Sequence, residues 1–340
     1  MCKKEPVKNA WIIKYNKELA LNAQKEENMV EDSQIKAEVS PFAIRKGEIK
    51  TFDGQDGYVS MNQIVHKINI GHITDIHFAI LELVNEFEFI TSRQLMQMLE
   101  VKGYDVGSQD KLNNKLESLV KSKILTRYFF NSDEGKGIYR IYCLEKMGKY
   151  LLGTREIECK WQQSDNTKPV AMIKKRLAGN QVLIAYLQKV KVFDSYIVKP
   201  TLKAKVMGKV FKASGGAVKL TKAKKSIEFL FEVIRREDNW QTKLIEKMKF
   251  YKDFYDNFVP MDSGFEGLPQ LILVCEDDKH MAETFKEIVV NNIEFKNINL
   301  YYTTDLKQIN TSLDRSLTEF KLDPETKKYK AYVPEVKVLG

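Results

Sequence analysis

Apolar side chains recur at helical spacing in the first half of the chain, beginning at Ile73. Thr74 stands just before this stretch and can cap a helix. A second apolar stretch follows Thr91, with Gln94 three residues further on as in a capping box. A third follows Ser108, again a residue type that starts helices. The pattern predicts three short helices in succession.

Two runs rich in β-forming residues come next, at 124–130 and 138–144. The residues between them, 131–137, are polar and contain two glycines, which predicts a turn. Three short helices followed by a two-stranded hairpin is the order of a winged helix-turn-helix. We therefore expect an α+β winged helix-turn-helix domain over residues 71–160, preceded by a partly irregular extension over residues 1–70.

The second half alternates between strands and helices. A polar stretch, 162–168, reads as a linker, and a helix over 170–189 follows it. Further helices are expected to open at Asn239 and near His280. The expected strands are 192–198, 204–212, 227–234, 271–275 and 298–303. This alternation predicts an α/β domain with a largely parallel core over residues 161–340.

Composition supports two folded domains. The chain has 340 residues, of which 43% are hydrophobic, enough to bury a core. No stretch approaches the roughly 20 apolar residues of a membrane span, and no apolar segment of a secretion signal follows Met1. Four scattered cysteines without a CxxC pair favour a reducing compartment. We expect a cytoplasmic protein without membrane contact.

The net charge of +9 is concentrated in one segment. Between Thr201 and Lys225 there are eight lysines and no acidic residue, and outside this segment 47 basic residues nearly balance 46 acidic ones. A focused basic segment suits a polyanion such as nucleic acid. The alternative is a surface hairpin that its lysines keep soluble. The eight are Lys203, Lys205, Lys209, Lys212, Lys219, Lys222, Lys224 and Lys225.

The third predicted helix is the candidate for reading the major groove of double-stranded DNA. Its outward residues are of the types that bind base edges and phosphates. They are Gln109, Lys111, Asn113, Asn114, Lys115 and Ser118. Phosphate contacts are expected from Arg127, Lys136 and Arg140 in the hairpin and from Lys219, Lys222, Lys224 and Lys225 in the basic segment. The same domain could instead bind a protein.

Catalytic signatures are sparse. The four histidines show no metal-ligand spacing, and the chain lacks phosphate-binding glycine loops and a Gly-x-Ser-x-Gly turn. We therefore expect no cofactor and no metal. Glu232 at a strand end, followed by a helix with Lys247, resembles the PD-(D/E)xK nuclease core, whose metal needs two acids from adjacent strands. The nuclease core needs further charged groups at two positions, which are occupied here by Ile234 and Gly216. Glu232 and Lys247 are thus weak catalytic candidates, and Glu232 is better explained by a structural ion pair.

Three segments between Ile73 and Ile309 resemble the replication-relaxation family of plasmid and mobile-element proteins of Gram-positive bacteria. They are 142–152, similar to the family's LT-x-x-G-x-x-xL segment, 176–180, similar to its short helix motif, and 229–251, similar to its E-x-D…K-x-x-x-Y signature. Glu232, Lys247 and Tyr251 match the last signature, whereas Ile234 replaces its aspartate. Gly216 stands where the family's Arg-Pro-Asp places an acid.

The resemblance implies a winged helix followed by a degenerate restriction-endonuclease-like domain. It implies a sequence-specific DNA-binding protein that acts in plasmid replication, DNA relaxation or mobilisation, or in the regulation of these steps. Partners would be double-stranded DNA, replication or transfer proteins, and a second copy of the chain in a homodimer. The alternatives are a metal-dependent nickase or relaxase built on Glu232 and a protein-interaction adaptor.

Overall fold

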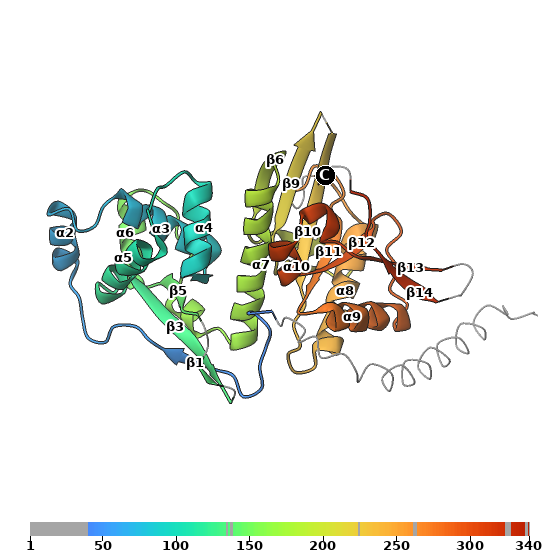
Figure 1. The fold of residues 1–340 in the computed structure, drawn as a ribbon, viewed down its shortest axis with the longest axis horizontal. Helices are drawn as coiled ribbons and strands as arrows, with labels where there is room; N and C mark the ends of the chain where they lie inside the picture. Colours follow the sequence, from blue (N-terminus) through green and yellow to red (C-terminus); the bar gives the residue numbers. More distant parts are fainter. Residues whose placement is uncertain are drawn as a thin grey trace, which may run out of the picture.

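The chain forms a mixed α and β structure with two lobes, and the long helix α7 (Val170–Lys189) lies between them (Figure 1). The structure is a computed structural model. It describes residues 40–133, 135, 136, 139–223, 225–260, 264–323, 328–336 and 339. Most of the expected N-terminal extension, residues 1–39, lies outside these ranges.

The first lobe contains the three predicted helices, α3 (Asp75–Phe87), α4 (Ser92–Val101) and α5 (Gln109–Lys121). Their starts are those expected from the sequence. Thr91 and Gln94 form the capping box of α4, and the Ser108 hydroxyl accepts a hydrogen bond of 3.3 Å from the Lys111 amide at the start of α5. The apolar faces of these helices pack into one core. Helix α6 (Lys146–Thr154) follows the hairpin.

The hairpin belongs to a larger sheet than the sequence predicted. Strands β3 (Leu125–Ser132) and β5 (Ile141–Leu144) pair antiparallel, and the order of the sheet is β1-β3-β5-β2, with β4 (Gly135–Lys136) paired to β3. The short strand β2 (Ile90–Thr91) lies on β5. Strand β1 (Ile49–Phe52) lies on β3. Strand β1 was not predicted within the partly irregular extension, because it takes its hydrogen bonds from a strand far along the chain.

Residues before the first predicted domain are part of the first lobe. Helix α2 (Met61–Asn69) begins with a capping box between Ser60 and Gln63, and its Ile64 is fully buried in the shared core. The Lys67 ammonium donates a hydrogen bond of 2.7 Å to the Ser122 hydroxyl at the end of α5. Residues 49–69 therefore extend the first lobe.

Helix α7 has the predicted bounds but not the predicted exposure. The sequence carries apolar residues such as Ile173, Leu177 and Tyr186 at helical spacing, as on a one-sided helix, whereas the structure buries the helix from Ile173 to Tyr186 with the exception of a half-buried Lys175. The helix contacts α4 of the first lobe and β10 (Lys225–Val233) of the second. The residues before it do not form a loose linker either, because Asn166 is buried and donates a hydrogen bond of 2.8 Å to the Leu144 carbonyl.

The second lobe is built on a five-stranded sheet of order β12-β11-β10-β9-β6. Strands β10, β11 (Gln270–Cys275) and β12 (Leu300–Thr304) are parallel, as expected. Strands β9 (Ala217–Lys222) and β6 (Phe193–Ile197) are antiparallel neighbours. Two of the four strand pairings in this sheet are therefore parallel, and the other two are antiparallel.

Both faces of this sheet are covered by helices. Along β10, Phe229, Phe231 and Val233 pack in the core that contains α7, whereas Leu230 packs in a second core with α8 (Trp240–Asp256). This alternation follows the two-residue period of a strand. Helix α9 (Asp278–Val290) contacts β11 and β12, and α10 (Asp305–Asn310) contacts α7.

Two hairpins lie outside the main sheet. The predicted strand 204–212 is a tight hairpin of β7 (Thr201–Ala204) and β8 (Lys209–Lys212), because a turn centred on Val206 and Met207 interrupts it. Strands β13 (Glu319–Leu322) and β14 (Tyr329–Tyr332) pair near the end of the chain.

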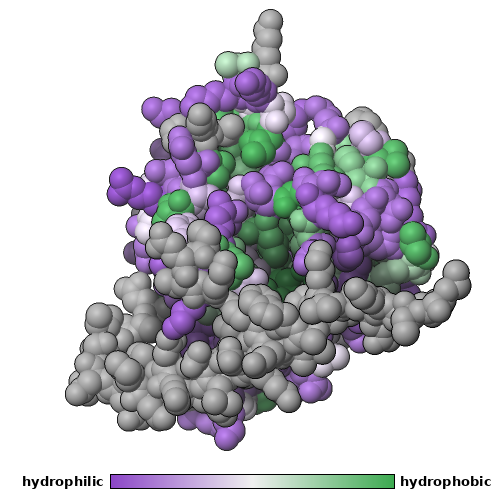
Figure 2. Space-filling view, turned by 90° about the vertical axis from the view of Figure 1, so that its right-hand side faces the viewer, coloured by the Kyte–Doolittle hydropathy of each residue, from purple (hydrophilic) through white to green (hydrophobic). Residues whose placement is uncertain are grey.

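The outer surface of the second lobe is largely polar. Where described residues are visible on this face, Figure 2 shows mainly hydrophilic side chains with hydrophobic ones in separate patches. Within the described ranges, each helix is too short or too polar to cross a membrane.

Candidate nucleic-acid interface

A basic cavity of about 440 Å³ lies where the two lobes meet. Its wall combines the end of α3, the first turns of α7 and α8, the end of β10, and the segments on either side of the β7–β8 hairpin. Eight cationic and three acidic residues line it. The cations are Lys168, Lys175, Arg176, Lys199, Lys212, Arg235, Lys243 and Lys247, and the acids are Glu88, Glu232 and Glu237. The excess of positive charge favours an anionic ligand.

Glu88 gathers three of these cations. It follows α3 with a positive φ of 64°, at the turn that leads from α3 into β2. Its carboxylate contacts the ammonium groups of Lys168 and Lys199, and lies 3.7 Å from the Arg176 guanidinium. Burial lowers the pKa of Arg176 to about 10, and the negative charge of Glu232 opposes this shift. One carboxylate thus neutralises only part of the local charge.

Glu237 holds a second pair of cations at the cavity. Its carboxylate contacts the ammonium of Lys175 and lies 2.8 Å from that of Lys243. Burial disfavours ionisation of Glu237, but the hydrogen bonds from Lys175 and Lys243 outweigh it and lower the pKa. Among the described residues the Lys212 ammonium makes no hydrogen bond and no ion pair, so it is available to a ligand.

Glu232 is buried at the cavity floor and is held from three sides. Its carboxylate accepts hydrogen bonds of 2.9 Å from the Ser214 hydroxyl and 2.6 Å from the Tyr251 hydroxyl. The Lys247 ammonium lies 3.8 Å away. Burial and the neighbouring Glu232 carboxylate raise the pKa of Tyr251 well above its ordinary value, so the phenol stays protonated and remains a donor. The predicted structural ion pair is present, although the Tyr251 and Ser214 hydroxyls are its closer partners.

A two-acid metal site cannot be built around Glu232 from its neighbours. Ser214, Gly215 and Gly216 precede the adjacent strand β9, where a second carboxylate would be needed, and Ile234 is apolar. In the described part of the chain, no group of three or more His, Cys, Asp or Glu side chains is placed to hold a metal ion. The segments next to Glu232 on β9 and β10 therefore supply no second carboxylate, and the excess of cations at the cavity suits an anion.

Glycines allow helix α7 to pack closely against the backbone that forms the cavity floor. A Cβ atom added to Gly179 of α7 would lie 2.7 Å from the Gly215 Cα and 2.8 Å from the Ser214 carbonyl oxygen. Gly216, with a φ of 85°, completes the turn into β9. Helix α7 therefore approaches the backbone of the Ser214 turn at a distance that only glycine permits.

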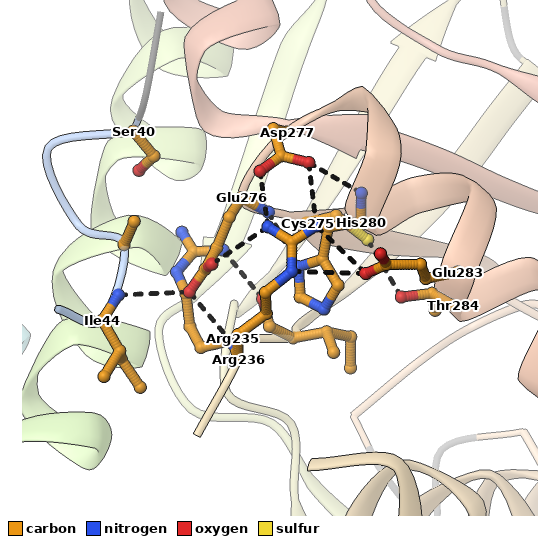
Figure 3. A network of polar contacts seen from close by, with 12 residues as sticks. Ser40, Ile44, Arg235, Arg236, Cys275, Glu276, Asp277, His280, Glu283 and Thr284 are labelled. Carbon is orange, nitrogen blue, oxygen red and sulfur yellow. Dashed lines mark hydrogen bonds and ion pairs between the residues drawn. The ribbon is translucent and has the colours of Figure 1, made fainter. Parts of the chain in front are cut away.

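The carboxyl ends of the parallel strands, a common ligand position in α/β sheets, are occupied by the chain itself. After β10 and β11, Arg236 pairs with Asp277 and with Glu283, the latter at 3.0 Å (Figure 3). The fully buried Arg235 lies 3.3 Å from the fully buried Asp305, which follows β12.

Residues 40–48 lie across this edge of the sheet. The Ser40 hydroxyl donates to Asp305, and the Ile44 amide donates to Glu276 at 3.2 Å (Figure 3 shows Ser40 and Ile44 beside the network). The Lys174 ammonium of α7 pairs with Glu48 at 2.5 Å. This network binds residues 40–48 to the second lobe. The chain itself thus covers this edge of the sheet, whereas the basic cavity is accessible.

Helix α5 presents part of the residue set that the sequence predicted. Lys111, Asn114, Lys115 and Ser118 line a shallow depression of about 570 Å³ together with residues from the start of α3. Gln109 and Asn113 lie outside this depression and share a hydrogen bond of 3.2 Å. The two neighbouring asparagines therefore point to different sides of the helix, as the 100° step per residue requires.

The predicted phosphate contacts of the hairpin are partly engaged within the lobe. The Arg127 guanidinium pairs with Glu117 and with Asp53, the latter at 2.9 Å, so it fastens the loop after β1 to α5. Arg140 also pairs with Asp53, at 2.8 Å, but remains exposed. Lys136 lies in β4, and its side chain is outside the described part of the structure.

The basic segment 201–225 divides between two places. Lys203, Lys205, Lys209 and Lys212 belong to the β7–β8 hairpin. Lys219 lies on β9 and pairs with Glu266 at 2.7 Å, which raises its pKa. Lys222 and Lys225 are exposed at the end of the β9–β10 pair, and Lys224 is outside the described residues. Of the lysines that the structure describes in the basic segment, Lys212 alone lines the cavity.

Comparisons with known proteins give little further information. No family model matches the sequence, and no curated protein matches it. Among solved structures, the chain is similar to the restriction endonuclease FokI at 9% sequence identity and a TM-score of 0.23. The alignment covers 78% of this chain and 54% of the FokI chain, so this chain spans about half the length of that structure. A likeness at this level establishes neither fold nor function.

Proposed function

We propose that the protein binds DNA and that the basic cavity holds a segment of the nucleic-acid backbone without cutting it. The observation that carries this proposal is the charge of the cavity. Besides the fully buried Arg235, which pairs with Asp305, seven cationic residues face three acidic ones, and Lys212 is unpaired within the described structure. A cavity of about 440 Å³ is in the size range of small-ligand sites. It can take a phosphate and its sugar, whereas the rest of a duplex lies outside it.

The first lobe supplies the recognition element in this proposal. Helices α3, α4 and α5 and the β3–β5 hairpin would act as a winged helix-turn-helix. Helix α5 exposes Lys111 and Asn114 and leaves Lys115 half-buried, and these residue types suit phosphates and base edges. Phosphate contacts at the cavity would fix the position of the protein on DNA, and α5 would read the sequence.

The second lobe would be a nuclease-like domain that has lost its metal site. Glu232 is the single carboxylate at the strand end, and its oxygens are already hydrogen-bonded to Ser214 and Tyr251. The resemblance to the replication-relaxation family supports a role in replication, relaxation or mobilisation of a plasmid or other mobile element, or in their regulation. A nickase and a protein adaptor remain the rival functions, and they are outcomes of the tests.

A mobility-shift assay tests the proposal. Overlapping fragments of the genetic element that encodes the protein are titrated over a salt series, since phosphate contacts make binding strongly salt-dependent. One fragment should be bound more tightly than the others, and all fragments should bind more weakly as salt rises. Absence of binding to every fragment at low salt, together with copurification of a protein, would replace the proposal by the adaptor function.

A further inference from the structure

The β7–β8 hairpin carries exposed apolar side chains at its tip. Val206 is 80% exposed, Met207 45% and Val210 67%. Single exposed apolar residues are ordinary on protein surfaces, but here three lie within five consecutive positions. The same hairpin carries four lysines: Lys205 and Lys209 adjoin the turn, Lys203 pairs with Val210, and Lys212 lies at the base of the hairpin.

The tip is held rigidly. The buried Asp253 of α8 accepts hydrogen bonds from the backbone amides of Val206 and Met207, at 3.2 and 2.7 Å. Gly208, with a φ of 62°, closes the turn, and its amide donates to the Lys205 carbonyl at 3.3 Å. Because Asp253 holds the backbone of this turn, the Val206 and Met207 side chains are exposed to solvent in a defined position.

The base of the hairpin is equally fixed. Leu202 and Phe211 are paired across the two strands and are buried in the core of α8. The Phe211 ring packs edge-on against Tyr251, with 5.1 Å between ring centroids. Since Tyr251 also binds Glu232, the hairpin and the floor of the basic cavity are parts of one packed unit.

The charge around the tip indicates what it contacts. Lys212, the last residue of β8, lines the cavity, so a basic surface continues from the cavity onto the hairpin. Proteins that bend DNA use apolar wedges of this kind, often including methionine, which enter between base steps while flanking cations bind the phosphates. A cation-rich apolar tip could also touch an anionic lipid surface, but a cavity between two protein lobes cannot be reached by a flat membrane.

We propose that the β7–β8 hairpin is a DNA-deforming wedge, in which Val206 and Met207 insert between base pairs and the hairpin lysines contact the adjacent phosphates. This inference rests on the proposed DNA binding and adds a distinct activity, the bending of the duplex. The insertion involves no covalent step. Its energetic cost is the unstacking of one base step, which the new apolar and phosphate contacts offset.

The test compares the double variant Val206→Ser/Met207→Ser with the wild type. Serine keeps the backbone amides that Asp253 binds, so the melting temperature should not change. The probe is a 40-base-pair duplex of mixed sequence with several TA steps, carrying one fluorophore at each end, at low salt. The wild type should raise energy transfer between the ends. The variant should bind with affinity within a few-fold of the wild type and lose most of that rise.

A matched control is Val290→Ser, an exposed apolar residue on α9, which should behave as the wild type. If the wild type binds the duplex and the variant raises energy transfer equally, or if neither changes it, the wedge is refuted while DNA binding stands. If the wild type does not bind the duplex at all, the proposed function fails and the wedge fails with it. Binding of the wild type, but not of the variant, to phosphatidylserine vesicles, with unchanged DNA bending, would assign the tip to a membrane surface instead.

Discussion

The phenolic hydroxyl of Tyr251 donates a hydrogen bond of 2.6 Å to the carboxylate of Glu232, and both groups are buried. This contact joins the end of β10 to the middle of α8. It holds the Glu232 carboxylate in place together with Ser214, whose hydroxyl binds the other carboxylate oxygen. Two hydroxyl donors and a nearby lysine satisfy the charge without a metal ion.

We predict that Glu232→Gln preserves DNA binding. The amide oxygen can still accept from Tyr251, and loss of the negative charge makes the cavity more positive, so affinity should be equal or tighter. Fluorescence anisotropy with labelled duplex measures it, and plasmid nicking with Mg²⁺ or Mn²⁺ is assayed in parallel. Metal-dependent nicking by the wild type that this substitution abolishes would establish the nickase instead.

The two asparagines of α5 should contribute unequally. Asn114 lines the depression with Lys111 and Lys115, whereas Asn113 pairs with Gln109 outside it. Asn114→Ala should lower affinity for the preferred fragment by roughly 1–3 kcal/mol, the value of a good base contact, with little effect on unrelated DNA. Asn113→Ala is the matched control and should change both affinities little. Equal loss on all sequences would show that Asn114 binds the backbone.

Gly179→Ala should destabilise the protein by about 1–3 kcal/mol, because the added methyl would overlap the backbone of Ser214 and Gly215. Gly153→Ala is the matched control, since it also lies in a helix but has open space around it. It should be neutral or slightly stabilising. Urea unfolding followed by circular dichroism measures both. Equal stability of the two variants would contradict the close approach of α7 to the cavity floor.

Acid should destabilise the first lobe through His77. Burial lowers the pKa of this histidine to about 4, and the nearby Lys115 acts in the same direction. Between the ordinary pKa of about 6.5 and pH 4, the unfolded chain takes up a proton that the folded chain does not. The free energy of unfolding therefore falls as the pH falls through this window, by up to about 3 kcal/mol from this residue.

His77→Gln should remove that part of the pH dependence. The His77 ring accepts a hydrogen bond of 3.1 Å from the Thr74 amide at the start of α3, and a glutamine fills the same role in the caps of α2 and α4. Urea unfolding at pH 7 and pH 4.5 measures the difference. His280 and the other titrating groups are common to both proteins. An identical loss of stability in the variant would show that His77 does not carry the effect.

Local signals in the sequence located most helices of the fold. Thr91 with Gln94 and Ser108 mark the starts of α4 and α5 because capping depends on residues three positions apart. The bounds of α7 also follow from its composition and from Pro169. The burial of Lys174 and Arg176 on α7 does not follow, because their partners Glu48 and Glu88 lie far away in the chain.

The cavity could be predicted only in part. Glu232, Lys247 and Tyr251 stand close together in the sequence and meet as their strand-and-helix spacing suggests. Glu88 and Lys199 come from different lobes, and no periodicity indicates that they touch. Composition predicted that Lys219 of the basic segment contacts phosphate. In the structure it pairs with Glu266 from a distant loop, a contact that composition does not indicate.

The salt dependence of DNA binding by a cavity variant tests the central claim most directly. Lys212→Gln/Lys247→Gln removes two cations from the cavity wall, and Lys286→Gln/Lys296→Gln removes two exposed cations elsewhere on the second lobe. Each lost phosphate contact lowers the slope of log K against log salt by about 0.9, so the cavity variant should lose up to about 1.8. The control should keep the wild-type slope and melting temperature, whereas the cavity variant should remain folded with a lower melting temperature, because Lys247 lies 3.8 Å from the buried Glu232 carboxylate. A cavity variant that is folded and has the same affinity and slope as the control would contradict the account, because DNA would then bind without the cavity.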